Sequence, residues 1–152
     1  VAGTCTAGTC SDPAQADGTA CDDTNGCTVS DVCTAGTCGG TTITAPGEAQ
    51  GVIVAADKVT YSWSALSGAT GYDVLRGSTG AFPVGPGGGD ESLTPCFGSL
   101  VGTTLNDADL PAVGTGFWYL SRGTNTCGTG TYGFQGVNGA PGAPRGSATT
   151  CP

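Results

Sequence analysis

The clearest alternation of apolar and polar residues lies in residues 58–64. Three apolar residues alternate there with three polar ones: Val59, Tyr61 and Trp63 with Thr60, Ser62 and Ser64. A period of two places successive side chains on opposite faces of an extended chain, so one face is apolar and the other polar. The segment is predicted to be an antiparallel strand with one face buried.

Other short runs of strand-forming residues are bounded by Gly, Pro or Asn. These runs cover residues 51–56, 72–76, 101–105, 117–122 and 131–137. No stretch keeps a helical period over several turns. Short strands separated by turn residues are typical of all-β folds. We therefore predict a β-sandwich over residues 41–152, with an insertion at 77–98.

A six-residue motif occurs twice near the N-terminus, with an interval of 28 residues. Cys-Thr-Ala-Gly-Thr-Cys stands at residues 5–10 and again at 33–38. The second copy is complete, whereas only the end of the first is present. We therefore predict a Cys-rich repeat region at 1–40, with a partial copy at 1–10 and a full copy at 11–40. Its turn residues indicate short hairpins and loops, and its cysteines leave the disulfide pairing open.

Composition limits the size of the apolar core. The 152 residues include 29 Gly but only 2 Trp, 4 Tyr and 4 Phe, and no Met. A region that lacks large apolar side chains is commonly stabilised by disulfides, and the chain has 9 Cys. Because disulfides persist in oxidising surroundings, we predict a secreted protein, extracellular or at the cell surface.

The ionisable residues exclude several classes of function. Histidine is absent, which excludes His-based triads, His-ligated metals and imidazole acid-base catalysis. The net charge of -8 disfavours nucleic acid and anionic membranes as partners. No apolar run reaches the roughly 18 residues that a membrane span needs. We expect neither a nucleic-acid partner nor membrane insertion.

The sequence offers no convincing catalytic group. The glycine-rich residues 85–91 lack the lysine of a phosphate-binding loop. Asp90 and Glu91 are adjacent on this glycine-rich segment, so they have no defined separation across a sugar ring. Lys58 lies on the polar face of a predicted strand, where a Ser-Lys dyad is not expected. We predict that the protein is not an enzyme.

Residues 21–31 hold a cluster of oxygen donors that suits calcium. The candidate ligands are Asp22, Asp23, Asn25 and Asp31, with Asp17 in reserve. An EF-hand is excluded, because placing Gly26 at its invariant glycine position puts Cys21 and Val32 where acidic ligands belong. Any calcium site here would use a different type of loop. The alternative is that these residues only form turns and solvate a small loop.

Two stretches resemble fibronectin type III domains of bacterial secreted proteins. Trp63, the Gly68-Ala69 turn and residues 72–76 are similar to the family's B-strand, turn and C-strand. Residues 104–125 are similar to its E-strand, tyrosine corner and F-strand, although Phe117 stands where tyrosine is usual. The Asp-Asp-x-Asn-x-Cys-Thr repeat resembles Cys-rich arrays in myxobacterial-type surface proteins. The resemblance implies a modular cell-surface or matrix protein.

Two features indicate association between chains. In the register of that family, Phe117 and Tyr119 point into the core, which leaves Trp118 and Leu120 directed outward. Either the 77–98 insertion or a partner subunit would cover them. Nine cysteines cannot all pair within one chain, so an intermolecular disulfide or a free thiol is expected.

We therefore predict a structural subunit of an extracellular filament or surface matrix, stabilised by disulfides and calcium. It would self-associate head to tail into a homopolymer through the Trp118 and Leu120 face and the N-terminal partial repeat. The alternative is a secreted adhesive or carbohydrate-binding module of a larger surface protein. In that case exposed Trp118 and Tyr132 would stack on the sugar rings of a glycan.

Overall fold

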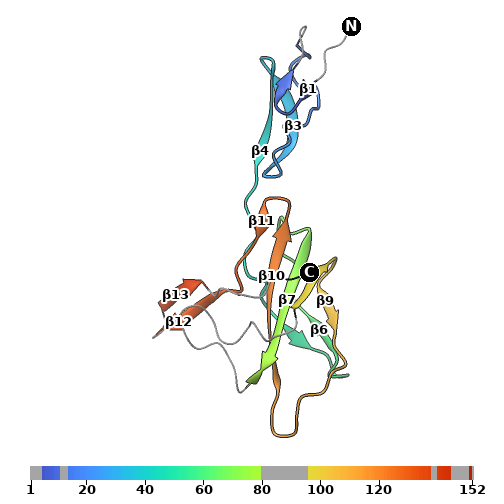
Figure 1. Ribbon diagram of the computed structural model, residues 1–152, viewed down its shortest axis with the longest axis vertical. Coiled ribbons are helices and arrows are strands. Elements are labelled where there is room, and N and C mark those ends of the chain that lie inside the picture. The colour runs from blue at the N-terminus through green and yellow to red at the C-terminus, as the bar shows by residue number, and fades with distance from the viewer. Residues whose placement is uncertain (1–4, 11–13, 80–95, 138–139, 145–150, 152) are drawn as a thin grey trace. The chain divides into compact units, whose positions relative to one another are not determined.

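The computed structural model describes residues 5–10, 14–79, 96–137, 140–144 and 151 (Figure 1). Within these ranges the protein is all-β, with antiparallel sheets and no α-helix. The chain divides into two compact units, Val1–Thr44 and Ala45–Pro152. Most of the predicted insertion, including Asp90 and Glu91, lies outside the described residues.

Unit 1 contains one antiparallel sheet. Its strands are β1 (Cys5–Thr6), β2 (Thr9–Cys10), β3 (Thr28–Thr34) and β4 (Thr37–Thr42), in the order β1-β2-β4-β3. The two copies of the six-residue motif form equivalent hairpins, in which Cys5 opposes Cys10 and Cys33 opposes Cys38. The same sequence therefore adopts the same local structure twice.

The Ala-Gly step explains why each motif turns. Ala7 and Gly8 have φ of 50° and 79°, and Ala35 and Gly36 have φ of 49° and 80°. Two successive residues with positive φ are the requirement of the type I′ turn, whose twist matches that of the flanking strands. Glycine adopts this conformation at low steric cost, so the second position of each turn suits it.

Unit 2 is built from two main sheets. One contains β5 (Ile53–Val54), β6 (Thr60–Ser62) and β9 (Thr104–Asn106), in the order β5-β6-β9. The other contains β7 (Gly71–Ser78), β8 (Cys96–Leu100), β10 (Phe117–Asn125) and β11 (Gly128–Thr129), in the order β11-β10-β7-β8. A further pair consists of β12 (Phe134–Val137) and β13 (Ala140–Pro144). The long strands β7 and β10 lie side by side (Figure 1).

The main core of unit 2 draws on both of these sheets. Tyr61 of β6 and Trp63, which directly follows β6, pack in one cluster with Tyr72 and Val74 of β7. The Trp63 and Tyr72 rings meet edge to face with centroids 5.5 Å apart. Of the apolar face predicted for residues 58–64, Tyr61 and Trp63 are buried as the alternation indicated, whereas Val59 is partly buried.

The predicted exposure of Trp118 and Tyr132 is wrong. Only 7% of Trp118 and 1% of Tyr132 is exposed, and both pack with Leu75 in a second apolar cluster. Cys96 and Leu120 pack against that cluster, and a disulfide joins Cys96 to Cys151. This outward face of β10 is thus covered by the chain itself, because residues distant in sequence fold over it.

Gly77 on β7 gives room for the Trp118 ring. A Cβ atom at Gly77 would overlap that ring, so glycine is required where the indole lies over the neighbouring strand. The indole Nε1 donates a hydrogen bond of 2.8 Å to the Ser78 carbonyl. The Trp118 side chain is thereby fixed within unit 2.

Candidate metal centre

The acidic loop of unit 1 begins at Cys21 and leads into β3. A disulfide joins Cys21 to Cys38 of β4, with Cα atoms 6.1 Å apart. The Cys21 amide donates a hydrogen bond of 3.0 Å to the Asp31 carbonyl, which holds the start of the loop against β3. The loop is thus constrained by a covalent link and by the sheet.

Within the loop, side-chain oxygens accept hydrogen bonds from the backbone two residues further on. Asp22 Oδ1 accepts from the Thr24 amide at 2.7 Å, and Asp23 Oδ1 accepts from the Asn25 amide at 2.8 Å. Asn25 Oδ1 accepts from the Cys27 amide at 3.0 Å. These are Asx turns, so three of the four predicted ligands form turns, as the alternative interpretation requires.

Asp23 is held in its charged form. The hydrogen bond from the Asn25 backbone lowers the pKa of Asp23 most strongly, and the Thr28 hydroxyl, 2.9 Å from Asp23 Oδ1, lowers it further. A carboxylate that accepts several hydrogen bonds is stabilised in its ionised state. Asp23 is therefore negatively charged down to acidic pH.

The loop also brings three carboxylates together. Asp22, Asp23 and Asp31 each offer one oxygen, and these oxygens lie within 4.8 Å of one another. Asp31 Oδ2 accepts from the Asp23 amide at 3.3 Å, whereas Asp31 Oδ1 is buried and has no hydrogen-bond partner among the described residues. Gly40 of β4 lies against this carboxylate, and a Cβ there would overlap Asp31 Oδ1. The donor set suits a hard cation.

Asp17, the reserve ligand, has a separate role. Its Oδ1 accepts a hydrogen bond of 2.8 Å from the Ala35 amide in the β3–β4 turn. It is not among the carboxylates that cluster with Asp31. Asp17 therefore stabilises the hairpin turn of the complete repeat.

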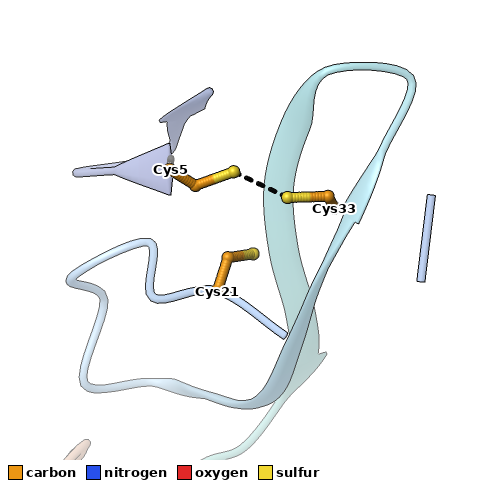
Figure 2. A group of neighbouring side chains, drawn as sticks. All are labelled: Cys5, Cys21 and Cys33. Carbon is orange, nitrogen blue, oxygen red and sulfur yellow. Dashed lines mark hydrogen bonds between the residues drawn. The ribbon is translucent and has the colours of Figure 1, made fainter. Parts of the chain in front are cut away.

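A second cluster in unit 1 consists of sulfur atoms. Figure 2 shows Cys5, Cys21 and Cys33, whose Sγ atoms lie within 4.8 Å of one another. Cys5 Sγ and Cys33 Sγ are 2.6 Å apart and occupy equivalent positions of the two repeat copies. Cys5 and Cys21 are both disulfide-bonded, so they offer no thiolate to a metal ion. Sequence analysis did not predict this cluster, although the shared position in the repeat is a signal for it.

Unit 2 contains a buried charge network that sequence analysis also missed. Arg76 Nη1 donates to both oxygens of Asp107 at 2.6 and 2.8 Å, and to Asp109 Oδ2 at 2.8 Å. The Tyr119 hydroxyl donates to Asp107 at 2.9 Å. The Arg76 guanidinium also lies 4.4 Å from the centre of the Phe117 ring. Every charge in this network has a partner of opposite sign.

The network shifts the pKa of its members. Burial by itself raises the pKa of Asp107, but the hydrogen bonds from Arg76, from the Asp109 amide and from Tyr119 outweigh it and lower the pKa. Burial and the contacts with Tyr61 and Asp107 raise the pKa of Tyr119 far above its usual value. Asp107 is therefore ionised and Tyr119 neutral over the ordinary pH range.

Beside this network lies a groove of about 320 Å³. Its lining is mostly apolar and aromatic, with one lysine and one aspartate: Val54, Lys58, Tyr61, Asp109, Leu110, Pro111, Phe117 and Tyr119. Val54 and Leu110 are 51% and 86% exposed. The groove therefore opens next to the edge strand β5.

Comparisons with known proteins gave no match. No protein-family model matches the chain, and no curated protein or solved structure matches it. The described residues also contain no helix that is long and apolar enough to cross a membrane.

Proposed function

We propose that the protein is a structural subunit of an extracellular filament or surface matrix. The observation that carries this proposal is the cross-linking of a chain poor in large apolar residues. Disulfides join Cys21 to Cys38 and Cys96 to Cys151, which are 17 and 55 residues apart in the sequence. A disulfide contributes about 2–4 kcal/mol to stability, mainly by restricting the unfolded chain. Such stability suits a protein exposed to proteases.

We further propose that unit 2 is a fibronectin type III-like sandwich. Its three-stranded and four-stranded antiparallel sheets contribute side chains to one core, which supports this fold. The carbohydrate-binding alternative loses its support, because the two aromatic side chains on which it depended, Trp118 and Tyr132, are buried.

Assembly is tested on the full-length chain at increasing concentration. Negative-stain microscopy and light scattering should find polymers, and the mass of the non-reduced protein should include multiples of 14.6 kDa if disulfides link the subunits. Discrete particles with the mass of one chain at every concentration would contradict a filament role.

We propose that Asp22, Asp23 and Asp31 bind calcium. Asn25 is a weaker candidate ligand, because its side-chain oxygen already accepts a hydrogen bond from the Cys27 amide. The buried Asp31 Oδ1 and the close approach of the three carboxylates support this proposal. Without a cation, three negative charges so close together repel one another.

The metal proposal is tested by titrating calcium chloride into the protein and into Asp31→Asn. Binding to the folded state should raise the free energy of unfolding, by about 2.7 kcal/mol at a hundredfold excess over Kd. Asp31→Asn should abolish this gain. Asp17→Asn also removes one negative charge, but outside the cluster, so this variant should still be stabilised by calcium. An equal response of both variants, or no response of the native chain, would refute the site.

A further inference from the structure

The segment that includes β5 is exposed along its whole length. Residues 51–58 are all exposed, and they contain three consecutive apolar β-branched residues: Val52, Ile53 and Val54. Ile53 and Val54 are 64% and 51% exposed. Both faces of β5 are therefore in contact with solvent. Consecutive exposed apolar residues on a strand are unusual unless a partner covers them.

The backbone of β5 is also available on one side. β5 pairs with β6 and forms an edge of the β5-β6-β9 sheet, and no other described strand pairs with it. The Ala55 amide donates to the Thr60 carbonyl at 2.8 Å. Hydrogen-bonded pairs alternate along an antiparallel ladder, so the amide and carbonyl of Val54 point away from β6. They face the open edge of the sheet.

The groove beside β5 adds a complementary surface. Val54 and Leu110 form exposed apolar parts of its lining, and Lys58 adds a positive charge. Among the described residues Lys58 has no ion pair. The chain carries 12 acidic residues against 4 basic ones, so a second copy supplies many carboxylates that can approach this lysine.

We propose that β5 pairs antiparallel with β5 of a second copy across a two-fold axis, and this proposal rests on the self-association proposed above. Two copies of Val54 facing each other would exchange both hydrogen bonds, because each residue offers one outward amide and one outward carbonyl. The two sheets would join as β9-β6-β5 followed by the second copy's β5-β6-β9. The exposed β-branched side chains of β5 and the exposed apolar side chains that line the two grooves would become buried.

This two-fold contact replaces the Trp118 face as a site of association, and because it closes at two copies, a filament needs a second contact in addition. Trp118 is buried within its own unit, whereas β5 presents unpaired backbone and apolar side chains together. The negative charge of the two copies opposes their approach, and salt screens that repulsion. Salt also screens the attraction between Lys58 and a carboxylate of the second copy, so association is measured at low and at high ionic strength.

The test is sedimentation velocity of the full-length chain over a range of concentrations. Ile53→Lys places a charge on the edge strand, a change that blocks strand pairing. Val54→Pro removes only the outward amide, because the ladder bonds to β6 do not use it. Each variant should weaken association at least about tenfold. Val101→Lys, at a residue that is 92% exposed outside β5, should leave it unchanged. Far-ultraviolet circular dichroism confirms that each variant is folded.

The outcomes separate this inference from the proposed function. If the native chain associates and both β5 variants associate equally well, the β5 contact is wrong while the proposal of self-association stands. If the native chain is monomeric at all concentrations and salt levels, both proposals fail. If only the β5 variants lose association, the contact is established.

Discussion

The two units of this chain are stabilised in different ways. Among the described residues of unit 1, the buried side chains are those of Cys33 and Cys38. Unit 2 buries aromatic and aliphatic side chains from two sheets, together with the charges of Arg76 and Asp107. A small segment without large apolar residues depends on covalent links, whereas a longer one can bury a core and the ion pairs within it.

Reducing the disulfides should produce the largest difference in stability between the two units. We expect reducing agent to unfold Val1–Thr44, since each disulfide contributes about 2–4 kcal/mol and few apolar contacts compensate for its loss. Strands β7 and β10 should remain protected in unit 2. Hydrogen exchange with mass spectrometry measures both units in one sample. Equal loss of protection in the two units would contradict the comparison.

Removing one buried charge should destabilise unit 2 severely. Asp107→Ala should cost about 3–5 kcal/mol, because Arg76 would remain buried without its main partner. The control is Asp109→Ala, whose side chain is 68% exposed compared with 4% for Asp107. This change should cost less than about 1 kcal/mol. Urea unfolding followed by tryptophan fluorescence reports on unit 2, since both Trp63 and Trp118 lie there.

Truncating the second cluster tests its apolar packing. Leu75 is completely buried in one cluster with Trp118 and Tyr132, so Leu75→Ala should cost about 2–5 kcal/mol. Val101→Ala changes a residue that is 92% exposed and should alter stability by no more than about 0.5 kcal/mol. Similar losses in the two variants would show that the cluster contributes little.

Acid should weaken unit 2 through Asp107. Its pKa is lower in the folded than in the unfolded chain, so its contribution is fully present above the unfolded value of about 3.9. That contribution is lost as pH falls through the folded pKa. Urea unfolding at a series of acidic pH values should show this decline, and Asp107→Asn should flatten it. An unchanged decline in that variant would assign the effect to other carboxyl groups.

The smallest effect is expected at the hairpin turn of unit 1. Gly36 has φ of 80°, and alanine in this left-handed region costs about 1–2 kcal/mol. Gly39→Ala lies in β4, where no atom comes within 4 Å of the added Cβ, and should be better tolerated. Thermal unfolding with the disulfides intact compares the two variants. A larger loss for Gly39→Ala would contradict the turn assignment.

Alternation of apolar and polar residues predicted burial correctly where one face of a strand packs against the core. Tyr61 and Trp63 are buried as their spacing predicts, although β6 covers only Thr60–Ser62. The apolar run at 51–56 forms only the short strand Ile53–Val54, and it is exposed. β8 was not predicted, because Cys96–Leu100 contains glycine and serine without a clear period. It forms because β7 offers an adjacent edge.

The sequence by itself determined the local features of this protein: strands without helix, the two equivalent hairpins and the turns of the acidic loop. These features depend on residues close together in the chain, so their spacing reveals them. Only the tertiary structure decided that Arg76 pairs with Asp107 and that Trp118 is covered. These contacts join distant segments, and they follow from how strands pair and pack, which one sequence does not specify residue by residue.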